Sequence, residues 1–268
     1  MRTTLRWLST IGICTPVAVG LSPGCSQGGG TGTACGTLQI ADCWTGPFNL
    51  QPDFFAAVPT QSSGALQIRI QNGGGIETFS DGIAILIDDI ANVQLGQTTI
   101  VSLPVGVAPP GVPIVANPTP PNVHATLYLQ KSCRTQNLAL YALAAVALNP
   151  DGSCGAPGSG EPNTCPLPAP TGTLTSDGAT PLTIDASVDG GPAAVSAPIG
   201  VSTIVFDKLF DGDPNESDAD KRLTDVPDFD LYFADPRDTP LGPPPCLGHL
   251  VGNFKFYFER GQPEQPYP

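Results

Sequence analysis

The sequence predicts an all-β protein, an antiparallel β-sandwich or jelly-roll-like domain that is stapled by disulfides. Glycine and proline contribute 31 residues each to a chain of 268, and this composition is typical of a chain with many turns and little helix. Between the turns, short segments alternate apolar and polar residues. Alternation with a period of two is typical of half-buried strands, and eight cysteines are available for disulfides.

Alternation is most regular in residues 253–259, where Phe254, Phe256 and Phe258 occupy every second position. Their rings fall on one face of a strand, which we expect to belong to the core. The NGGG sequence at 72–75 predicts a hairpin turn instead of a phosphate-binding loop, since it opens no helix and lacks a lysine. The same alternation predicts further strands at 65–71, 83–88, 98–103, 123–130, 201–209 and 229–234.

Residues 138–148 (LALYALAAVAL) fit two structures. Alanine and leucine favour a helix, whereas an unbroken apolar run also fits a fully buried strand. We predict a strand, because the segment follows the strand predicted at 123–130 after a short polar turn, as in a hairpin.

The chain begins with the features of an export signal. Arg2 and Arg6 precede an apolar run over residues 7–21 that contains no charged residue. This run is shorter than the roughly 20 apolar residues that a membrane-spanning helix needs. We therefore expect residues 1–24 to be a signal peptide that is removed.

The residues at the end of this segment, Leu21-Ser22-Pro23-Gly24-Cys25, resemble the lipobox of bacterial lipoproteins. The resemblance implies that Cys25 is acylated and becomes the first residue of the mature chain. Ser26, in place of an aspartate, is similar to lipoproteins that are sent on to the outer membrane. The alternative is ordinary cleavage after Gly20, which would release a soluble secreted protein.

The cysteine count favours lipidation. Cys14 leaves with the signal, and lipidation of Cys25 reduces the eight cysteines to six, an even number that can form three disulfides. Cleavage after Gly20 would instead leave seven and one unpaired thiol, which is a liability in an oxidising compartment. The candidate disulfide cysteines are Cys35, Cys43, Cys133, Cys154, Cys165 and Cys246.

Spacing restricts the pairing of these cysteines. If residues 37–42 are extended, Cys35 and Cys43 lie roughly 26 Å apart, far beyond the approximately 7 Å limit between bridged α-carbons. We therefore expect them to have different partners. Cys154 is predicted to pair with Cys165, because the Gly/Pro-rich residues between them can fold back.

As a whole, the chain resembles uncharacterised bacterial lipoproteins of the outer-membrane type, with a Gly-rich tether and a cysteine-stapled β domain. The resemblance implies export and membrane attachment through a lipid anchor, facing the periplasm or the cell surface, and it implies no activity. The expected organisation is a signal peptide at 1–24, a lipidated cysteine and flexible tether at 25–34, and a single β-sandwich domain at 35–268 in which 151–170 form a stapled loop.

The charge balance excludes some partners. Only 11 lysines and arginines stand against 24 acidic residues, giving a formal net charge of −13. No basic patch is available to displace counterions, so nucleic acid and anionic lipid headgroups are poor partners. A protein or glycan partner is compatible with the composition, which identifies neither.

The densest group of acidic residues directly follows the strand predicted at 201–209. Alternating oxygen ligands of this kind are what calcium prefers. The spacing departs from an EF-hand loop, since Gly212 stands at the second position and Glu216 at the sixth. A solvated acidic loop is the alternative. The candidate calcium ligands are Asp211, Asp213, Asn215, Asp218 and Asp220.

Catalytic motifs are not found. His124 and His249, the two histidines, fall on the polar faces of their strands and are predicted to be surface residues without metal-ligand partners. No G-x-S-x-G motif occurs. We therefore expect a non-enzymatic exported lipoprotein with a structural or interaction role, without a cofactor. The alternatives are a calcium-dependent surface binding or adhesion module, and a secreted hydrolase whose carboxylate pair carries no sequence signature.

Overall fold

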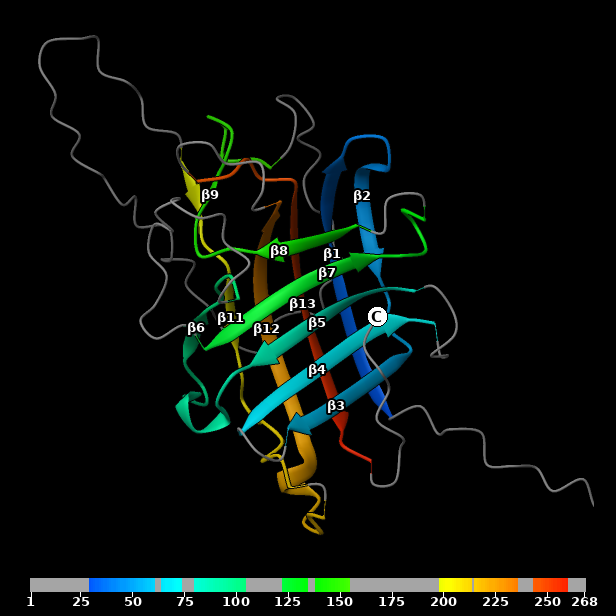
Figure 1. Ribbon diagram of the computed structural model, residues 1–268, viewed down its shortest axis with the longest axis vertical. Helices are drawn as coiled ribbons and strands as arrows, with labels where there is room; N and C mark the ends of the chain where they lie inside the picture. The colour runs from blue at the N-terminus through cyan, green and yellow to red at the C-terminus, as the bar shows by residue number, and fades with distance from the viewer. Residues whose placement is uncertain are drawn as a thin grey trace, which may run out of the picture.

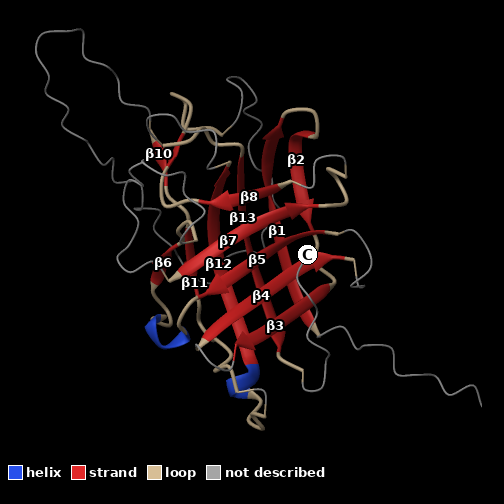
Figure 2. Ribbon diagram, viewed as in Figure 1, coloured by secondary structure: helices blue, strands red, loops and turns tan. Residues whose placement is uncertain are grey.

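The computed structural model describes residues 29–60, 64–73, 80–104, 122–134, 138–154, 198–213, 215–235 and 243–259. These residues form an all-β antiparallel structure, as predicted, and the only helical segments in them are two short 3-10 helices, η1 (Ile90–Asn92) and η2 (Asp220–Arg222) (Figure 2). No helix in the described part of the chain is long and apolar enough to cross a membrane.

The described strands form one large sheet and one small pair. The large sheet has the order β2-β1-β13-β12-β8-β7-β5-β4-β3, with β11 and β6 joined beside β12. The pair is β9 with β10. The strands are β1 (Gly30–Ile40), β2 (Trp44–Leu50), β3 (Phe54–Thr60), β4 (Ala65–Asn72), β5 (Asp81–Ile87), β6 (Thr98–Ile100), β7 (Val123–Leu129), β8 (Ala139–Ala142), β9 (Val146–Ala147), β10 (Ile199–Gly200), β11 (Thr203–Val205), β12 (Leu223–Ala234) and β13 (Gly248–Tyr257).

The large sheet folds over itself to make a sandwich. β12 and β8 share only two residue pairs, Phe233 with Ala142 and Ala234 with Tyr141, and the sheet bends there. One layer then contains β3, β4, β5, β7 and β8, whose strands run obliquely across those of the other layer, β2, β1, β13 and β12 (Figure 1). We call them the β4 layer and the β13 layer.

The core lies between the two layers and is made of alternate residues. Phe254 and Phe256 are buried as the alternation predicted, and the Phe256 ring stacks on that of Phe55 from the opposite layer, with 5.7 Å between centroids. Phe258 is only partly buried but packs against the same core and stacks on Phe210. The inward residues of the β4 layer include Ile68, Ile70, Ile83, Ile85, Val123, Ala125 and Leu127.

Every predicted strand segment contains a strand, but some are shorter than expected. The segments 98–103 and 201–209 form strands only at β6 and β11. Residues 138–148 form two short strands, β8 and β9, instead of one. β8 pairs antiparallel with β7, as the hairpin prediction required.

The N-terminal boundary of the domain differs from the prediction. Residues 30–34 were expected in the flexible tether, but they form the first half of β1 and pair with β13. Gly30 and Gly32 pack directly beneath Phe256 and Phe254, where an added Cβ would come within 2.7 and 2.8 Å of the phenylalanine Cβ atoms. Glycine is needed at these two positions because the phenylalanines leave no room for a side chain, so these glycines do not indicate a flexible linker. Residues 25–28 lie outside the described residues, as do 155–170 of the predicted loop.

Candidate functional site

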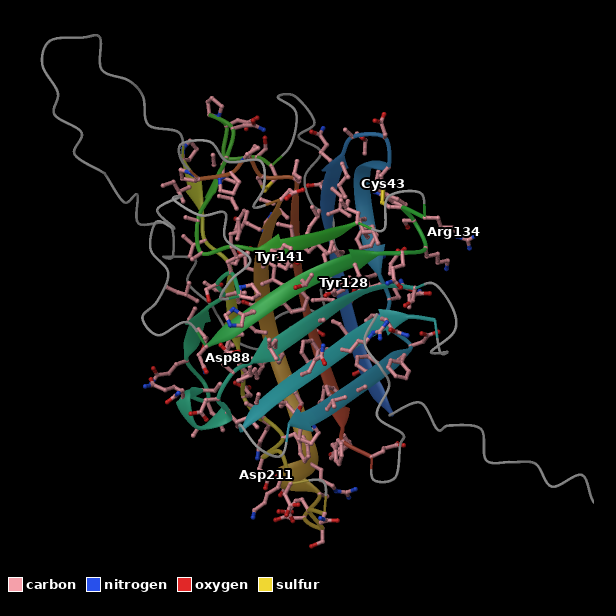
Figure 3. All side chains as sticks on the ribbon, in the orientation of Figure 1. Cys43, Asp88, Tyr128, Arg134, Tyr141 and Asp211 are labelled. Atoms are coloured by element: carbon pink, nitrogen blue, oxygen red, sulfur yellow. A yellow bond between two sulfur atoms is a disulfide. The ribbon has the colours of Figure 1, made fainter. Side chains whose placement is uncertain are left out.

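The predicted calcium ligands lie on the loop between β11 and β12 (Asp211 in Figure 3), and all five are exposed. Their carboxylates are used by the loop's own backbone. The amide of Asp213 donates to Asp211 Oδ1 at 3.0 Å, that of Asn215 to Asp213 Oδ1 at 2.8 Å, and that of Asp220 to Asp218 Oδ1 at 3.0 Å. Such side-chain-to-backbone turns stabilise a loop without any ion.

Glu216 belongs to the same pattern. Its Oε1 accepts from the amide of Asp218 at 2.7 Å, and its pKa is lowered by that hydrogen bond and by the nearby Lys221. Among the described residues, no group of three or more His, Cys, Asp or Glu side chains is placed to hold a metal ion. In the described part of the loop, these carboxylates serve as hydrogen-bond acceptors for backbone amides.

Four of the described cysteines form two bridges with one another. Cys43 pairs with Cys133, with 5.3 Å between α-carbons, and joins the turn after β1 to the turn after β7, so it ties the two layers together. Cys43 is therefore not bridged to Cys35, as the spacing predicted. Cys35 is also disulfide-bonded, to a partner outside the described residues. Cys25 and Cys165 both lie outside them.

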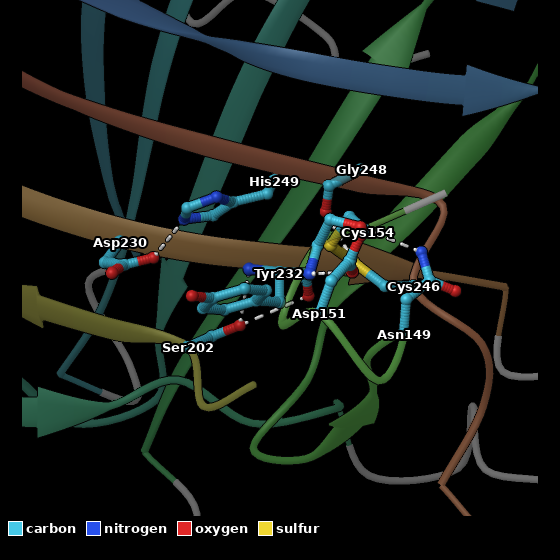
Figure 4. The surroundings of a disulfide bond; sticks show 10 residues. Asn149, Asp151, Cys154, Ser202, Asp230, Tyr232, Cys246, Gly248 and His249 are labelled. Carbon is cyan, nitrogen blue, oxygen red and sulfur yellow. Dashed lines mark hydrogen bonds and ion pairs between the residues drawn. A yellow bond between two sulfur atoms is a disulfide. The ribbon is translucent and has the colours of Figure 1, made fainter. Parts of the chain in front are cut away.

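Cys154 pairs with Cys246, so the predicted Cys154–Cys165 bridge is wrong (Figure 4). The backbone explains the choice. The segment before β13 runs beside β9, where Cys246 donates its amide to the carbonyl of Ala147 at 3.0 Å. This places Cys246 5.0 Å from Cys154 between α-carbons, a contact between residues far apart in sequence that spacing alone could not reveal.

The turn that carries Cys133 is held by a buried carboxylate. Asp81 Oδ1 accepts from the amides of Lys131 and Ser132, both at 3.0 Å, and its Oδ2 accepts from the Ser132 hydroxyl at 2.6 Å. A buried carboxylate is stable only when its oxygens are satisfied in this way. Asp81 and the Cys43–Cys133 bridge therefore fix the same turn.

His124 is buried, contrary to the prediction of a surface residue. Its side chain is 2 % exposed. Nε2 lies 2.9 Å from Asp88 Oδ2, and Nδ1 lies 2.9 Å from the carbonyl oxygen of Ser102. The alternation correctly placed His124 on the outward side of β7, but the segments around Asp88 and Ser102 cover it there.

Asp88, His124 and Ser102 are the residue types of a hydrolytic triad, but their geometry fits a structural role. Ser102 is completely buried, and its hydroxyl lies 3.4 Å from Nδ1, farther than the Ser102 carbonyl oxygen. A base nitrogen must be available to the nucleophile, whereas Nδ1 here is directed at a backbone carbonyl. The three residues connect the ends of β5 and β7 to the segment after β6.

His249 lies on the outward side of β13 and contacts two residues of β12 (Figure 4). Its Nε2 is 2.7 Å from Asp230 Oδ1, and its ring stacks on that of Tyr232 with 4.2 Å between centroids. Ser202 fixes Tyr232, because its hydroxyl accepts from the Tyr232 amide at 2.9 Å. Burial raises the pKa of Tyr232 to about 12, and the negative charge of Asp230 adds to this effect.

The outward side of the β4 layer, which we call the outer face, carries the other group of polar and aromatic side chains. Tyr128 and Tyr141 stand on the neighbouring strands β7 and β8 (Figure 3), and Arg69 stands on β4. Burial raises the pKa of Tyr128 to about 12 and lowers that of Arg69. The small residues Gly82 and Ala84 of β5 lie between β4 and β7.

The sequence pattern contains part of the information that predicts this group. Arg69 and Tyr128 occupy polar positions of strands that were predicted correctly. The alternation does not predict the register between strands. In the structure, the register pairs Arg69 with Ala84, Ala84 with Thr126, and Thr126 with Tyr141. Only the register brings these side chains onto one row across the sheet.

Comparison with protein-family models, with curated proteins and with solved structures finds no match for the chain. Only the fold and the side chains described above therefore bear on the function of this chain.

The two shifted tyrosines predict a loss of stability at high pH. Burial raises the pKa of Tyr128 and of Tyr232 to about 12 in the folded chain, above the 10.0 of an ordinary tyrosine. The folded state favours the neutral phenols over the ionised ones. The stability that the neutral phenols give the fold is therefore complete below pH 10 and is lost as the pH rises toward 12. Between pH 10 and pH 12, a fully buried tyrosine of this pKa would lower the free energy of unfolding by about 1.4 kcal/mol per pH unit. We expect about half of that for each tyrosine, because both rings keep some contact with water.

Urea unfolding at pH 9, 10 and 11 measures this loss. The double variant Tyr128→Phe/Tyr232→Phe should lose markedly less stability between pH 10 and 11 than the parent chain. If the two lose it equally steeply, the buried phenols do not control the alkaline limit.

Proposed function

We propose that this chain is an exported β-sandwich that is attached to a membrane through a lipid on Cys25 and has a structural or interaction role in the cell envelope. The observation that carries the proposal is the pair of disulfides. Cys43–Cys133 and Cys154–Cys246 join residues 90 and 92 positions apart. Structural disulfides of this kind persist in oxidising compartments outside the cytoplasm and are rare inside it.

The start of the domain supports a short attachment. Gly30, the first residue of β1, follows Cys25 by only five positions. Five residues span at most about 17 Å, so an anchored domain would stand close to the membrane surface. Gly30 pairs with Phe256 near the end of β13. That end of the sandwich would face the membrane, and the turn with Cys43 at the other end of β1 would face away.

Mass spectrometry of the mature N-terminus tests the proposal. We expect a chain that begins with an acylated Cys25, because the lipobox precedes it and an even number of cysteines then remains. Cys25→Ala should move the protein from the membrane fraction to the soluble fraction. Cys14→Ala, a change within the predicted signal, should leave it in the membrane fraction. An unmodified mature chain that begins at Leu21 would show that the protein is secreted and soluble.

A further inference from the structure

Cys35 points away from the core and is nevertheless buried. Leu38 and Ile40 of β1 belong to the main core, so Cys35, at an odd spacing from both, points outward. It lies opposite Val251 of β13 on one side and Asn49 of β2 on the other. Asn49 is exposed, but Cys35 is only 4 % exposed and is disulfide-bonded. Its cover is therefore something that the disulfide holds against the outward side of the β13 layer.

The disulfide of Cys35 identifies this cover. The four other described cysteines are bridged with one another, so the partner of Cys35 lies outside the described residues. If the signal is removed and Cys25 carries a lipid, Cys165 is the cysteine that remains. The choice of Cys165 thus rests on the proposed function. Cys165 belongs to residues 155–197, which connect Cys154 to Pro198.

The described chain on both sides of residues 155–197 packs against this layer. Cys154, directly before them, is bridged to Cys246, two positions before β13 (Figure 4). Gly200, shortly after them, lies on the ring of Tyr232, where an added Cβ would come within 2.7 Å of a ring carbon. Cys154 and Tyr232 both pack against a satellite cluster that is separate from the main core. Satellite clusters of this kind form under long loops.

The length of the chain permits a Cys35–Cys165 bridge. Cys165 follows Cys154 by eleven positions, which span at most roughly 40 Å. On β13, Val251 lies opposite Cys35 and follows Cys246 by five positions, which is about 17 Å of extended chain. Cys165 therefore reaches Cys35 from the Cys154–Cys246 bridge with chain to spare.

Exposure along β13 agrees with this placement. The outward residues of β13 run from His249 to Tyr257 at every second position. Lys255 and Tyr257, at the end of β13 away from Cys246, are exposed. His249 and Val251, which pair with the β1 segment around Cys35, are half-buried. The outward side of β13 is thus covered at the Cys35 end and open at the other.

We propose that the covered part of this layer is a docking surface for residues 155–197 of the same chain, held there by a Cys35–Cys165 bridge. The bond of Cys35 lies within one chain, so the occupant is a segment of this chain and not a second copy. Partners in the cell envelope then meet the rest of the sandwich. The docking surface, which we call the Cys35 surface, has two neighbouring rows across β1, β13 and β12. They consist of Cys35, Val251 and Asp230, and of Thr37, His249 and Tyr232.

Hydroxyl-radical labelling of the purified mature protein, with its disulfides intact and mass spectrometry as the readout, measures the cover. Deletion of residues 172–192 keeps Cys165 and leaves eleven residues before Pro198, enough to span roughly 40 Å. His249 is 21 % exposed in the parent chain, and its labelling rate should rise at least about twofold when the cover is removed. Tyr257, exposed on the same strand, is the internal control and should be labelled at an unchanged rate.

The double variant Cys35→Ser/Cys165→Ser removes the bridge and leaves the segment in place. It should give the same rise at His249, and the melting temperature of each variant checks its folding. Unchanged labelling of His249 in both folded variants overturns the proposal, and so does an equal rise at Tyr257. A rise at His249 on simple dilution of the parent chain would show that a second copy covers the surface, and it overturns the proposal too.

A peptide map separates the Cys35 surface from the lipid anchor. A Cys35–Cys165 bridge with unchanged labelling in the variants overturns the docking surface alone. A bridge from Cys35 to Cys25 overturns both. A Cys35–Cys165 bridge with the expected labelling, in a chain whose N-terminus carries no lipid, supports the docking surface and overturns the anchor.

Discussion

Replacing Cys43 and Cys133 together by alanine is expected to lower the free energy of unfolding by about 4.6 kcal/mol, because the bridge closes a loop of 90 residues. In the chain-entropy description, a bridge stabilises the fold by restricting the unfolded chain, and the effect grows with the length of the closed loop. The bridge also joins the two layers at one end of the sandwich. Cys133 is buried in the main core, so its loss removes packing as well.

Urea unfolding of the double variant measures this loss, and the second bridge provides a matched control. Cys154 and Cys246 close a loop of 92 residues, so the double variant Cys154→Ala/Cys246→Ala should lose nearly the same stability. A loss below about 1 kcal/mol for either pair would contradict the entropic account. A large difference between the two pairs would show that local packing, not loop length, dominates.

A peptide map of the same material tests the remaining bridge. Cys35 is disulfide-bonded in the structure, and Cys165 is the one predicted disulfide cysteine that lies outside the described residues. If the six candidate cysteines form three bridges, Cys35 pairs with Cys165. A bridge from Cys35 to Cys25 would be incompatible with a lipid on the Cys25 sulfur.

Most strands of the β4 layer could be predicted from sequence, and β4 and β7 could because each has one apolar and one polar face, whereas β3 (Phe54–Thr60), which lacks a polar face, was not predicted. β4 and β7 show this most clearly, since Ile68 and Leu127 are completely buried while Arg69 and Tyr128 point outward. The first half of β1 escaped prediction because glycine fills its inward positions 30 and 32, whereas Leu38 and Ile40 supply core side chains only in the second half. The bulky residues that would mark its core side belong to β13, where Phe254 and Phe256 cover Gly32 and Gly30. A segment whose core volume comes from its neighbour, as residues 30–33 do, has no alternation of its own to detect.

The site residues were less predictable, because each depends on contacts between distant segments. Periodicity assigns a residue to one side of a strand, but it does not tell whether another segment covers that side. His124 is on the predicted side and is nevertheless buried by Asp88 and Ser102. The acidic loop shows the opposite case. Its composition suggested an ion site, but backbone amides two residues away already bind the carboxylates of Asp211 and Asp213.

Gly36→Ala is expected to lower the free energy of unfolding by more than about 3 kcal/mol, enough to prevent folding of a marginally stable chain. Gly36 lies in β1 opposite Leu250 of β13. An added Cβ would stand 1.8 Å from the carbonyl oxygen of His249 and 3.0 Å from the Leu250 α-carbon. These are backbone atoms, so no side-chain rotation can make room. β13 would have to move, but it is held between β1 and β12 by antiparallel pairing on both sides.

The matched control is Gly29→Ala, directly before β1, where an added Cβ meets nothing within 4 Å. It should fold like the parent chain, with a melting temperature within about two degrees, since a surface substitution usually changes stability by less than about 0.5 kcal/mol. The yield of soluble, fully oxidised protein and the urea midpoint are measured for both variants. If Gly36→Ala is as stable as Gly29→Ala, β1 and β13 do not approach as closely as the structure places them. The tight packing of Gly30 and Gly32 beneath the phenylalanines, which depends on the same pairing, would then be in question as well.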